Sequence, residues 1–155
     1  LWIDSDLGWQ PDAVLRMLQR NVDVIGGVYP IKTAVEAYPY MPIREPENGM
    51  QEVQGLPGGF MLCTRHAMER AAASVRLHSM AISGQAEMVP NVFDIVHEGP
   101  NLWGEDYVFC KRLRNLGFTL WAETDIDFTH VGVKVWEGNL SKRIAIEPKE
   151  QAGAA

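Results

Sequence analysis

The sequence has few of the features that mark disulfide-rich, membrane-spanning or nucleic-acid-binding proteins. It contains two cysteines, Cys63 and Cys110, whose spacing fits neither a disulfide framework nor a zinc site, so we expect reduced, packed thiols. No apolar run approaches the roughly 20 residues that cross a bilayer. No signal-peptide pattern is present either. We therefore expect a cytoplasmic protein without a transmembrane segment.

Basic residues are also scarce. Lysine and arginine number 14 against 20 aspartates and glutamates, which gives a net charge of −6. Because no basic stripe offsets this excess, we do not expect nucleic acid as a partner. A phosphate-bearing ligand is still compatible with the charge if a cation bridges it to acidic side chains.

The remaining composition is that of a globular domain. The chain has 155 residues, of which 46% are hydrophobic and 22% charged, enough for one domain with a real core. Strands are expected at 1–3, 24–29, 50–53, 60–63, 118–122 and 126–129, and helices at 11–21, 65–75 and 105–116. This alternation predicts an α/β fold with a mixed sheet flanked by helices.

Two stretches, residues 31–58 and residues 76–101, lack a sustained periodic pattern. We expect them to be largely irregular, with a turn at Ser83-Gly84. The first helix carries a clearer signal, an apolar stripe that should face the core. The stripe consists of Val14, Leu15 and Leu18.

Two aspartates follow directly on the first apolar run. Leu1-Trp2-Ile3 is expected to be a buried strand, and Asp4-Ser5-Asp6 comes at its end. In an extended chain Asp4 and Asp6 lie on one side and Ser5 on the other. Such a sequence often forms only a turn or a helix cap. The alternative is a divalent-cation site, because hard cations prefer carboxylate and phosphate oxygens.

Further groups suited to chemistry lie near the starts or ends of later elements. Glu105 and Asp106 open a predicted helix, where the dipole stabilises carboxylates and lowers their pKa. Stabilisation of the helix start is a sufficient structural reason for both carboxylates. An ionised carboxylate there can also act as a general base. His130 ends an apolar segment, as a hydrogen-bonded structural residue or as an imidazole metal ligand. Trp103 is either a core residue or a surface for a sugar ring.

The order of these elements resembles that of the GT-A glycosyltransferases, in particular family 2-like members. The resemblance is carried by Leu1–Asp6, Gly58–Leu62, Trp103–Arg112 and the segment ending in His130-Val131-Gly132. It implies a Mn²⁺ or Mg²⁺ ion held by Asp4, Asp6 and His130, with Asp4 also contacting the nucleotide. It also implies that Asp106 is the catalytic base and that Glu105, beside it, contacts the acceptor. The remaining substrate contacts would come from Trp103, Gly104, Gly58 and Gly59, the last two as a backbone lip beneath the sugars.

The resemblance covers residues 1 to about 132. The family's first strands and helices, which bind the nucleotide base, would precede Asp4. The chain is therefore similar to the C-terminal part of such a catalytic domain, with residues 1–133 as its metal- and acceptor-binding half and residues 134–155 as a polar C-terminal tail. The implied activity is inverting transfer of a sugar from a nucleoside-diphosphate sugar to a hydroxyl of a carbohydrate or other acceptor.

Two other function classes stay open. One is a non-catalytic glycosyltransferase-like fragment, in which the acidic pairs are only caps and turns. The other is a sugar-phosphate nucleotidyltransferase, which normally needs a glycine-rich nucleotide loop followed by basic residues, and the sequence has none. A second copy of the chain is a further expected partner if a sheet edge or apolar face is exposed.

Overall fold

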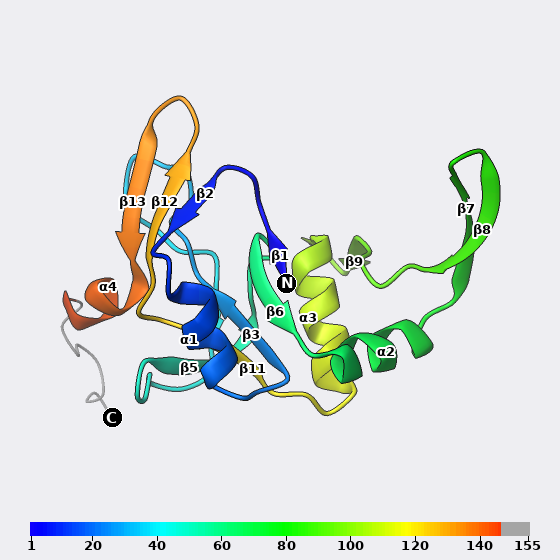
Figure 1. The fold of residues 1–155 in the computed structure, drawn as a ribbon, viewed down its shortest axis with the longest axis horizontal. Coiled ribbons are helices and arrows are strands. Elements are labelled where there is room, and N and C mark those ends of the chain that lie inside the picture. The colour runs from blue at the N-terminus through cyan, green and yellow to red at the C-terminus, as the bar shows by residue number, and fades with distance from the viewer. Residues whose placement is uncertain (147–155) are drawn as a thin grey trace.

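A mixed six-stranded sheet forms the centre of the computed structural model, which describes residues 1–146 (Figure 1). Its strand order is β1-β6-β3-β11-β5-β4. The bounds are β1 Trp2–Ile3, β6 Phe60–Cys63, β3 Val24–Gly27, β11 Leu120–Glu123, β5 Met50–Gly55 and β4 Met41–Pro42. Strands β3 and β11 are parallel, and the other neighbours are antiparallel. The predicted α/β fold with a mixed sheet is confirmed at this level.

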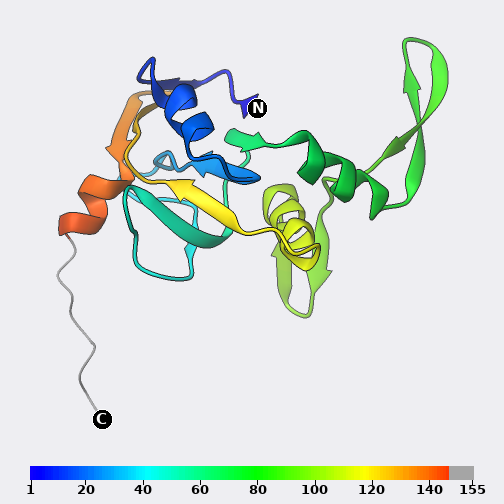
Figure 2. The ribbon, with the colours of Figure 1, turned by 60° about the horizontal axis from the view of Figure 1, so that its bottom comes forward.

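Helices cover both faces of this sheet (Figure 2). Helix α1 (Ala13–Gln19) packs on one face, and helices α2 (Arg65–Ala73) and α3 (Glu105–Asn115) on the other. Successive strand residues point to opposite faces, so Val24 joins the core under α2 and α3 while Ile25 joins the core under α1. Residues 24–29 and 60–63 are apolar at nearly every position because these strands are covered by helices on both faces.

A second, three-stranded antiparallel sheet has the order β13-β12-β2. It consists of β2 Leu7–Trp9, β12 Asp127–Val131 and β13 Val135–Asn139, and helix α4 (Leu140–Ile146) follows. We expected residues 134–155 to be a polar tail, but β13 pairs with β12 along its length and Leu140 is buried. The part of the expected tail from 147 to 155 lies outside the described residues.

Residues 77–103 form two hairpins that the sequence pattern did not predict. They are β7 Leu77–Ile82 with β8 Gln85–Pro90, and β9 Val96–Glu98 with β10 Asn101–Trp103. The predicted turn at Ser83-Gly84 is confirmed, since both residues have positive φ, 51° and 83°. The β7–β8 hairpin projects away from the sheet and is exposed almost throughout, so its strands lack the one-sided burial that creates an alternating pattern (Figure 1).

The expected apolar stripe of the first helix is wrong for two of its three residues, since only Val14 packs, partly buried, against the core. Leu15 and Leu18 are 62% and 54% exposed, whereas Ala13 and Met17 are buried. Positions 13 and 17 are four apart and share a face, so a small alanine lets the helix approach the sheet closely while methionine fills the gap. The strand at residues 1–3 is also not buried, because β1 lies at the sheet edge and Ile3 is 38% exposed.

Two helix ends are set by residues that the sequence marks clearly. Thr64, a residue type favoured as an N-cap, caps α2, its hydroxyl accepting a hydrogen bond from the Ala67 N–H at 3.2 Å. Gly117 follows α3 with φ of 91°, a conformation that favours glycine after a helix. Among residues 1–146, no helix is long and apolar enough to cross a membrane.

A buried ion pair joins α1 to the end of β11. Arg20 donates two hydrogen bonds to the Glu123 carboxylate, at 2.7 and 3.1 Å. The Glu123 side chain is fully buried, while that of Arg20 is 25% exposed. The pair therefore places a charge in the core that is tolerable only while the guanidinium faces it.

We expect Arg20→Met to lower the free energy of unfolding by about 3 kcal/mol, because it leaves the Glu123 carboxylate buried without its partner. The control is Arg16→Met, which removes an arginine of the same helix from exposed pairs with Asp12 and Asp125. That change should cost less than about 1 kcal/mol. Urea unfolding measures both, and equal losses would contradict the assignment of Glu123 as a core carboxylate.

Candidate active site

The Gly58–Gly59 dipeptide, between β5 and β6, is the point where three parts of the fold meet. The Gly58 N–H donates to Asp106 Oδ2 at 2.9 Å, and the Gly59 N–H donates to the Tyr29 hydroxyl at 3.1 Å. The Gly59 carbonyl accepts from the Asp4 N–H at 2.8 Å. The loop thus ties the start of α3, the end of β3 and the end of β1 to one another.

Glycine is required at both positions by close contacts. A Cβ at Gly58 would lie 2.5 Å from Asp106 Oδ1, and one at Gly59 would lie 2.5 Å from the Tyr29 hydroxyl and collide with the Asp4 carboxylate. Side-chain atoms essentially never approach this closely, so any larger residue must displace an acidic side chain or the tyrosine.

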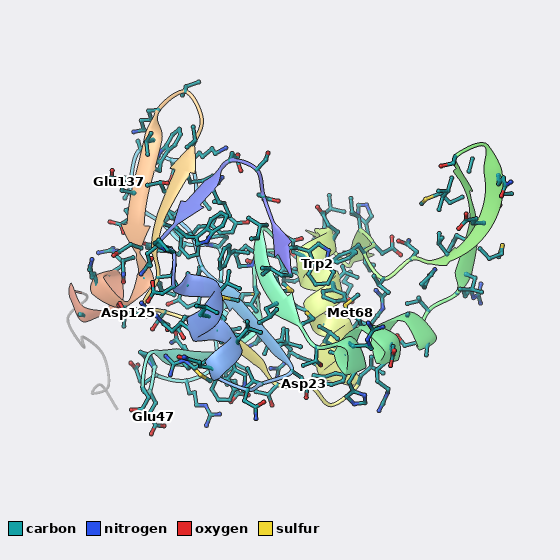
Figure 3. The ribbon with its side chains drawn as sticks, in the orientation of Figure 1. Trp2, Asp23, Glu47, Met68, Asp125 and Glu137 are labelled. Carbon is teal, nitrogen blue, oxygen red and sulfur yellow. The ribbon has the colours of Figure 1, made fainter. Side chains whose placement is uncertain are left out.

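A pocket of about 290 Å³ opens above this dipeptide. Its lining combines an apolar wall with carboxylates, and consists of Trp2, Ile3, Asp4, Gly58, Gly59, Met61, Phe93, Glu105 and Asp106. Trp2 lies beside α3 (Figure 3), its ring edge-on to Phe93 and Phe109 with centroids 5.7 and 6.0 Å apart. The structure thus brings together five of the predicted residues: Asp4, Gly58, Gly59, Glu105 and Asp106.

The Asp106 carboxylate is the half-buried acid of this pocket. Burial raises the pKa of Asp106 above its usual 3.8, although the Gly58 N–H opposes the shift, and the charges of Glu105 and Asp4 raise it further. The sequence argument predicted a lowered pKa from the helix dipole, and this was wrong in sign. Removal from water and two neighbouring negative charges outweigh the hydrogen bond from the Gly58 N–H.

The second acidic residue, Asp6, lies beside His130. Strand β2 pairs with β12 so that Leu7 stands opposite His130, and the Val131 N–H donates to the Asp6 carbonyl at 2.8 Å. His130 Nε2 lies 3.6 Å from Asp6 Oδ2. The Lys32 ammonium lies 2.5 Å from the same oxygen, and it is the leading cause of a lowered Asp6 pKa. We call these three side chains the Asp6 corner.

The orientation of His130 is set by its other ring nitrogen. His130 Nδ1 lies 2.8 Å from the Pro30 carbonyl oxygen, which can only accept, so Nδ1 carries the hydrogen. In the neutral ring, Nε2 therefore presents a lone pair toward the Asp6 carboxylate. An imidazole nitrogen and a carboxylate oxygen that face each other in this way are two groups of the kind that bind divalent cations.

Asp4 does not join this corner. Residues 4–7 form a turn closed by the Leu7 N–H and the Asp4 carbonyl at 3.3 Å, so the extended geometry predicted for Asp4-Ser5-Asp6 was wrong. Asp4 turns to Gly59 and the pocket, and Asp6 turns to His130. In the described chain, residues 1–146, no group of three or more histidine, cysteine, aspartate or glutamate side chains is placed to hold a metal. Of the three predicted metal ligands, only Asp6 and His130 lie close to each other.

Tyr29 connects the pocket to the Asp6 corner, and the sequence reasoning did not identify it. Its hydroxyl reaches Gly59, while its ring packs edge-on against His130 with centroids 5.1 Å apart. Burial raises the pKa of Tyr29 well above 10, and the charges of Asp4, Asp106 and Asp6 add to the shift. Tyr29 and Lys32 follow β3, a parallel strand, and the carboxyl ends of such strands are where ligand sites collect. Their position after this strand is the sequence signal that could have identified them as site residues.

Trp103 is directed to a neighbouring groove of about 260 Å³. It lines this groove with Tyr107 on the adjoining turn of α3, their ring centroids 6.3 Å apart. Gly104 is the N-cap residue of α3 and has free space around it, with no atom within 4 Å of a Cβ built there. The structure therefore does not bring Trp103 or Gly104, both predicted substrate contacts, into the lining of the pocket that contains Asp106.

Comparisons with known proteins do not assign the chain to a family. No protein-family model matches it, and no significant similarity to a curated protein was found. The solved structure of A197 from STIV is similar over 88% of this chain and 64% of that protein, with a TM-score of 0.49 and 18% sequence identity. The chain thus spans less than two thirds of that protein's length, and a likeness of this size assigns neither family nor activity.

We expect Gly59→Ser to lower the free energy of unfolding by about 1–3 kcal/mol, because its Cβ must displace Asp4 or Tyr29. Gly104→Ser is the matched control, since the space there is free and serine is a favoured N-cap. Its stability should equal or slightly exceed that of the wild type in urea unfolding. A Gly59→Ser protein as stable as the wild type would contradict the close packing around the dipeptide.

Asp106→Asn should stabilise the protein more at about pH 7 than at about pH 3. The folded protein binds the Asp106 proton more tightly than the unfolded chain, so stability falls as pH rises from 3.8 toward the raised pKa. Asparagine removes this loss and keeps an oxygen for the Gly58 N–H. Asp12→Asn should show the opposite trend, because Arg16 lowers the pKa of Asp12. Unfolding midpoints across this pH range test both, and the same trend in both variants would refute the shift.

Proposed function

We propose that the protein is an inverting glycosyltransferase of the GT-A type, which transfers a sugar from a nucleoside-diphosphate sugar to an acceptor hydroxyl. One observation carries the proposal. The half-buried Asp106 carboxylate accepts a hydrogen bond from the Gly58 N–H in a pocket that Asp4 also lines. Tyr29, which contacts both Gly59 and His130, connects this pocket to the Asp6 corner. This arrangement supports the proposal because it would put a base and a phosphate-bound cation on the two sides of Tyr29.

Asp106 is the proposed general base. Its Oδ2 accepts the Gly58 hydrogen bond, which holds the carboxylate in place, and its raised pKa makes it a stronger base than an exposed aspartate. The acceptor hydroxyl gives its proton to Asp106 as its oxygen forms a bond to the anomeric carbon. The bond from that carbon to the diphosphate oxygen breaks on the opposite face, and its electron pair leaves with the diphosphate.

The Asp6 corner is the proposed diphosphate end of the site. Asp6 and His130 would hold a divalent cation, which supplies positive charge to neutralise the departing diphosphate. Pro30 orients the imidazole through Nδ1, so that Nε2 stays available. Tyr29, buried between this corner and Gly59, sets the spacing between the two halves of the site.

The Gly58–Gly59 backbone and the apolar wall are the proposed sugar-binding surface. Because the Asp106 and Asp4 side chains fill the space beside Gly58 and Gly59, a ligand in the pocket would meet these two carboxylates above the glycine backbone. Trp2 and Met61, opposite each other in the β1–β6 pair, supply apolar surface on the same side. Such a combination of carboxylates with an apolar face suits the polar edge and apolar face of a sugar ring.

The test is turnover of UDP- and GDP-sugars by the full chain with Mn²⁺ or Mg²⁺, with release of the nucleoside diphosphate as readout. Asp106→Asn should lower turnover by about 10²–10⁴-fold, because it removes the base. Nucleoside-diphosphate binding, measured by calorimetry, should change by less than about twofold, since the Asp6 corner is intact.

The control is Asp94→Asn, which makes the same charge change at an exposed site outside the pocket. It should leave turnover unchanged. Full activity in Asp106→Asn would overturn the role of that residue. Absence of turnover with every donor, or pyrophosphate release from a nucleoside triphosphate instead, would overturn the proposed function.

A further inference from the structure

We propose that Lys32 is the resident cation of the Asp6 corner and that a divalent metal must displace it to bind. The inference rests on the proposed function in one respect, that Asp6 and His130 are the metal-binding pair. It assigns a role to a residue that the sequence motifs do not include.

The geometry makes Lys32 and a metal compete for one oxygen. Lys32 Nζ lies 2.5 Å from Asp6 Oδ2, and His130 Nε2 lies 3.6 Å from that same atom. A cation that bridges Asp6 and His130 would bind the oxygen that the ammonium holds. Metal–oxygen bonds are about 2 Å long, so the metal would lie within about 5 Å of Nζ. Two positive charges at that separation repel each other strongly, so the Lys32 ammonium would leave the Asp6 carboxylate when the divalent metal binds.

Lys32 is held in place by its stem and its loop. A Cβ at Gly132 would lie 3.3 Å from Lys32 Cδ and 3.6 Å from Cε, so the stem occupies space that the glycine leaves open. Next to it, the Trp136 indole N–H donates to the Thr33 carbonyl at 2.6 Å. The backbone of the loop is thus anchored to β13, and the ammonium is aimed at Asp6 from a fixed base.

The head of the side chain remains able to leave. The Lys32 side chain is 34% exposed and that of Asp6 is 41% exposed, so the ammonium can turn to solvent by rotation about its stem. In the metal-free protein, the ammonium neutralises Asp6, which otherwise faces the lone pair of His130.

The experiment is calorimetric titration with Mn²⁺ alone, without nucleotide, on the full chain. Lys32→Met should bind Mn²⁺ at least about tenfold more tightly than the wild type, because the competing charge is removed. Lys32→Arg keeps the charge and should bind no more tightly than the wild type. Asp6→Asn in the Lys32→Met background should lose the added affinity.

The matched control is Lys134→Met. Lys134 is a lysine of the β12–β13 turn whose ammonium lies over the Trp136 ring, 5.1 Å from its centroid. It makes the same change in net charge, and should alter Mn²⁺ affinity by less than about twofold. Equal gains in Lys32→Met and Lys134→Met would overturn the inference, as would no gain, or no Mn²⁺ binding, in Lys32→Met.

Failure of this inference and failure of the proposed function are distinguishable. Sugar transfer without tighter Mn²⁺ binding in Lys32→Met would overturn only the displacement of Lys32. Tighter Mn²⁺ binding in Lys32→Met, together with no transfer from any nucleotide sugar, would support the displacement and overturn the proposed function.

Discussion

The absence of side chains at Gly58 and Gly59 is the constraint on which the site depends. Without a Cβ at either position, the loop can accept Asp106, Tyr29 and Asp4 against its backbone at hydrogen-bond distance. These three residues come from different elements, α3, the segment after β3 and the end of β1. A wider loop would separate them and expose Asp106 to water, and with exposure the raised pKa would be lost.

Much of the fold could be predicted where local chemistry and burial agree. Strand β6 was placed correctly because a short apolar run marks it, and helix α3 because Gly117 follows its apolar face as a stop residue. The β7–β8 hairpin was missed because it is exposed on both faces, so its sequence carries no alternation. The buried face of α1 was misassigned because the decisive residue is a small alanine, Ala13, whose burial reflects the closeness of helix and sheet.

The site was predictable as a set of acidic residues, and its electrostatics were not. Pairing of β2 with β12 brings Asp6 to His130, as the order of motifs suggested. The turn at residues 4–7 then separates Asp4 from Asp6, and no sequence pattern encodes that direction. Tyr29 and Lys32 depend on which strand neighbours β3, a long-range fact. The pKa of Asp106 depends on burial, which the helix-dipole argument leaves out.

The most direct test of the account is to locate bound nucleoside diphosphate by proton–nitrogen correlation spectra of the labelled chain with Mg²⁺. The account predicts that the amide signals of Gly58, Gly59 and Val131 shift together on titration with UDP or GDP. The two glycines line the pocket, and the Val131 N–H is hydrogen-bonded to the Asp6 carbonyl. Shifts confined to the separate cavity between β2, β12, β13 and α4, which Gly138 and Lys142 line, would contradict it.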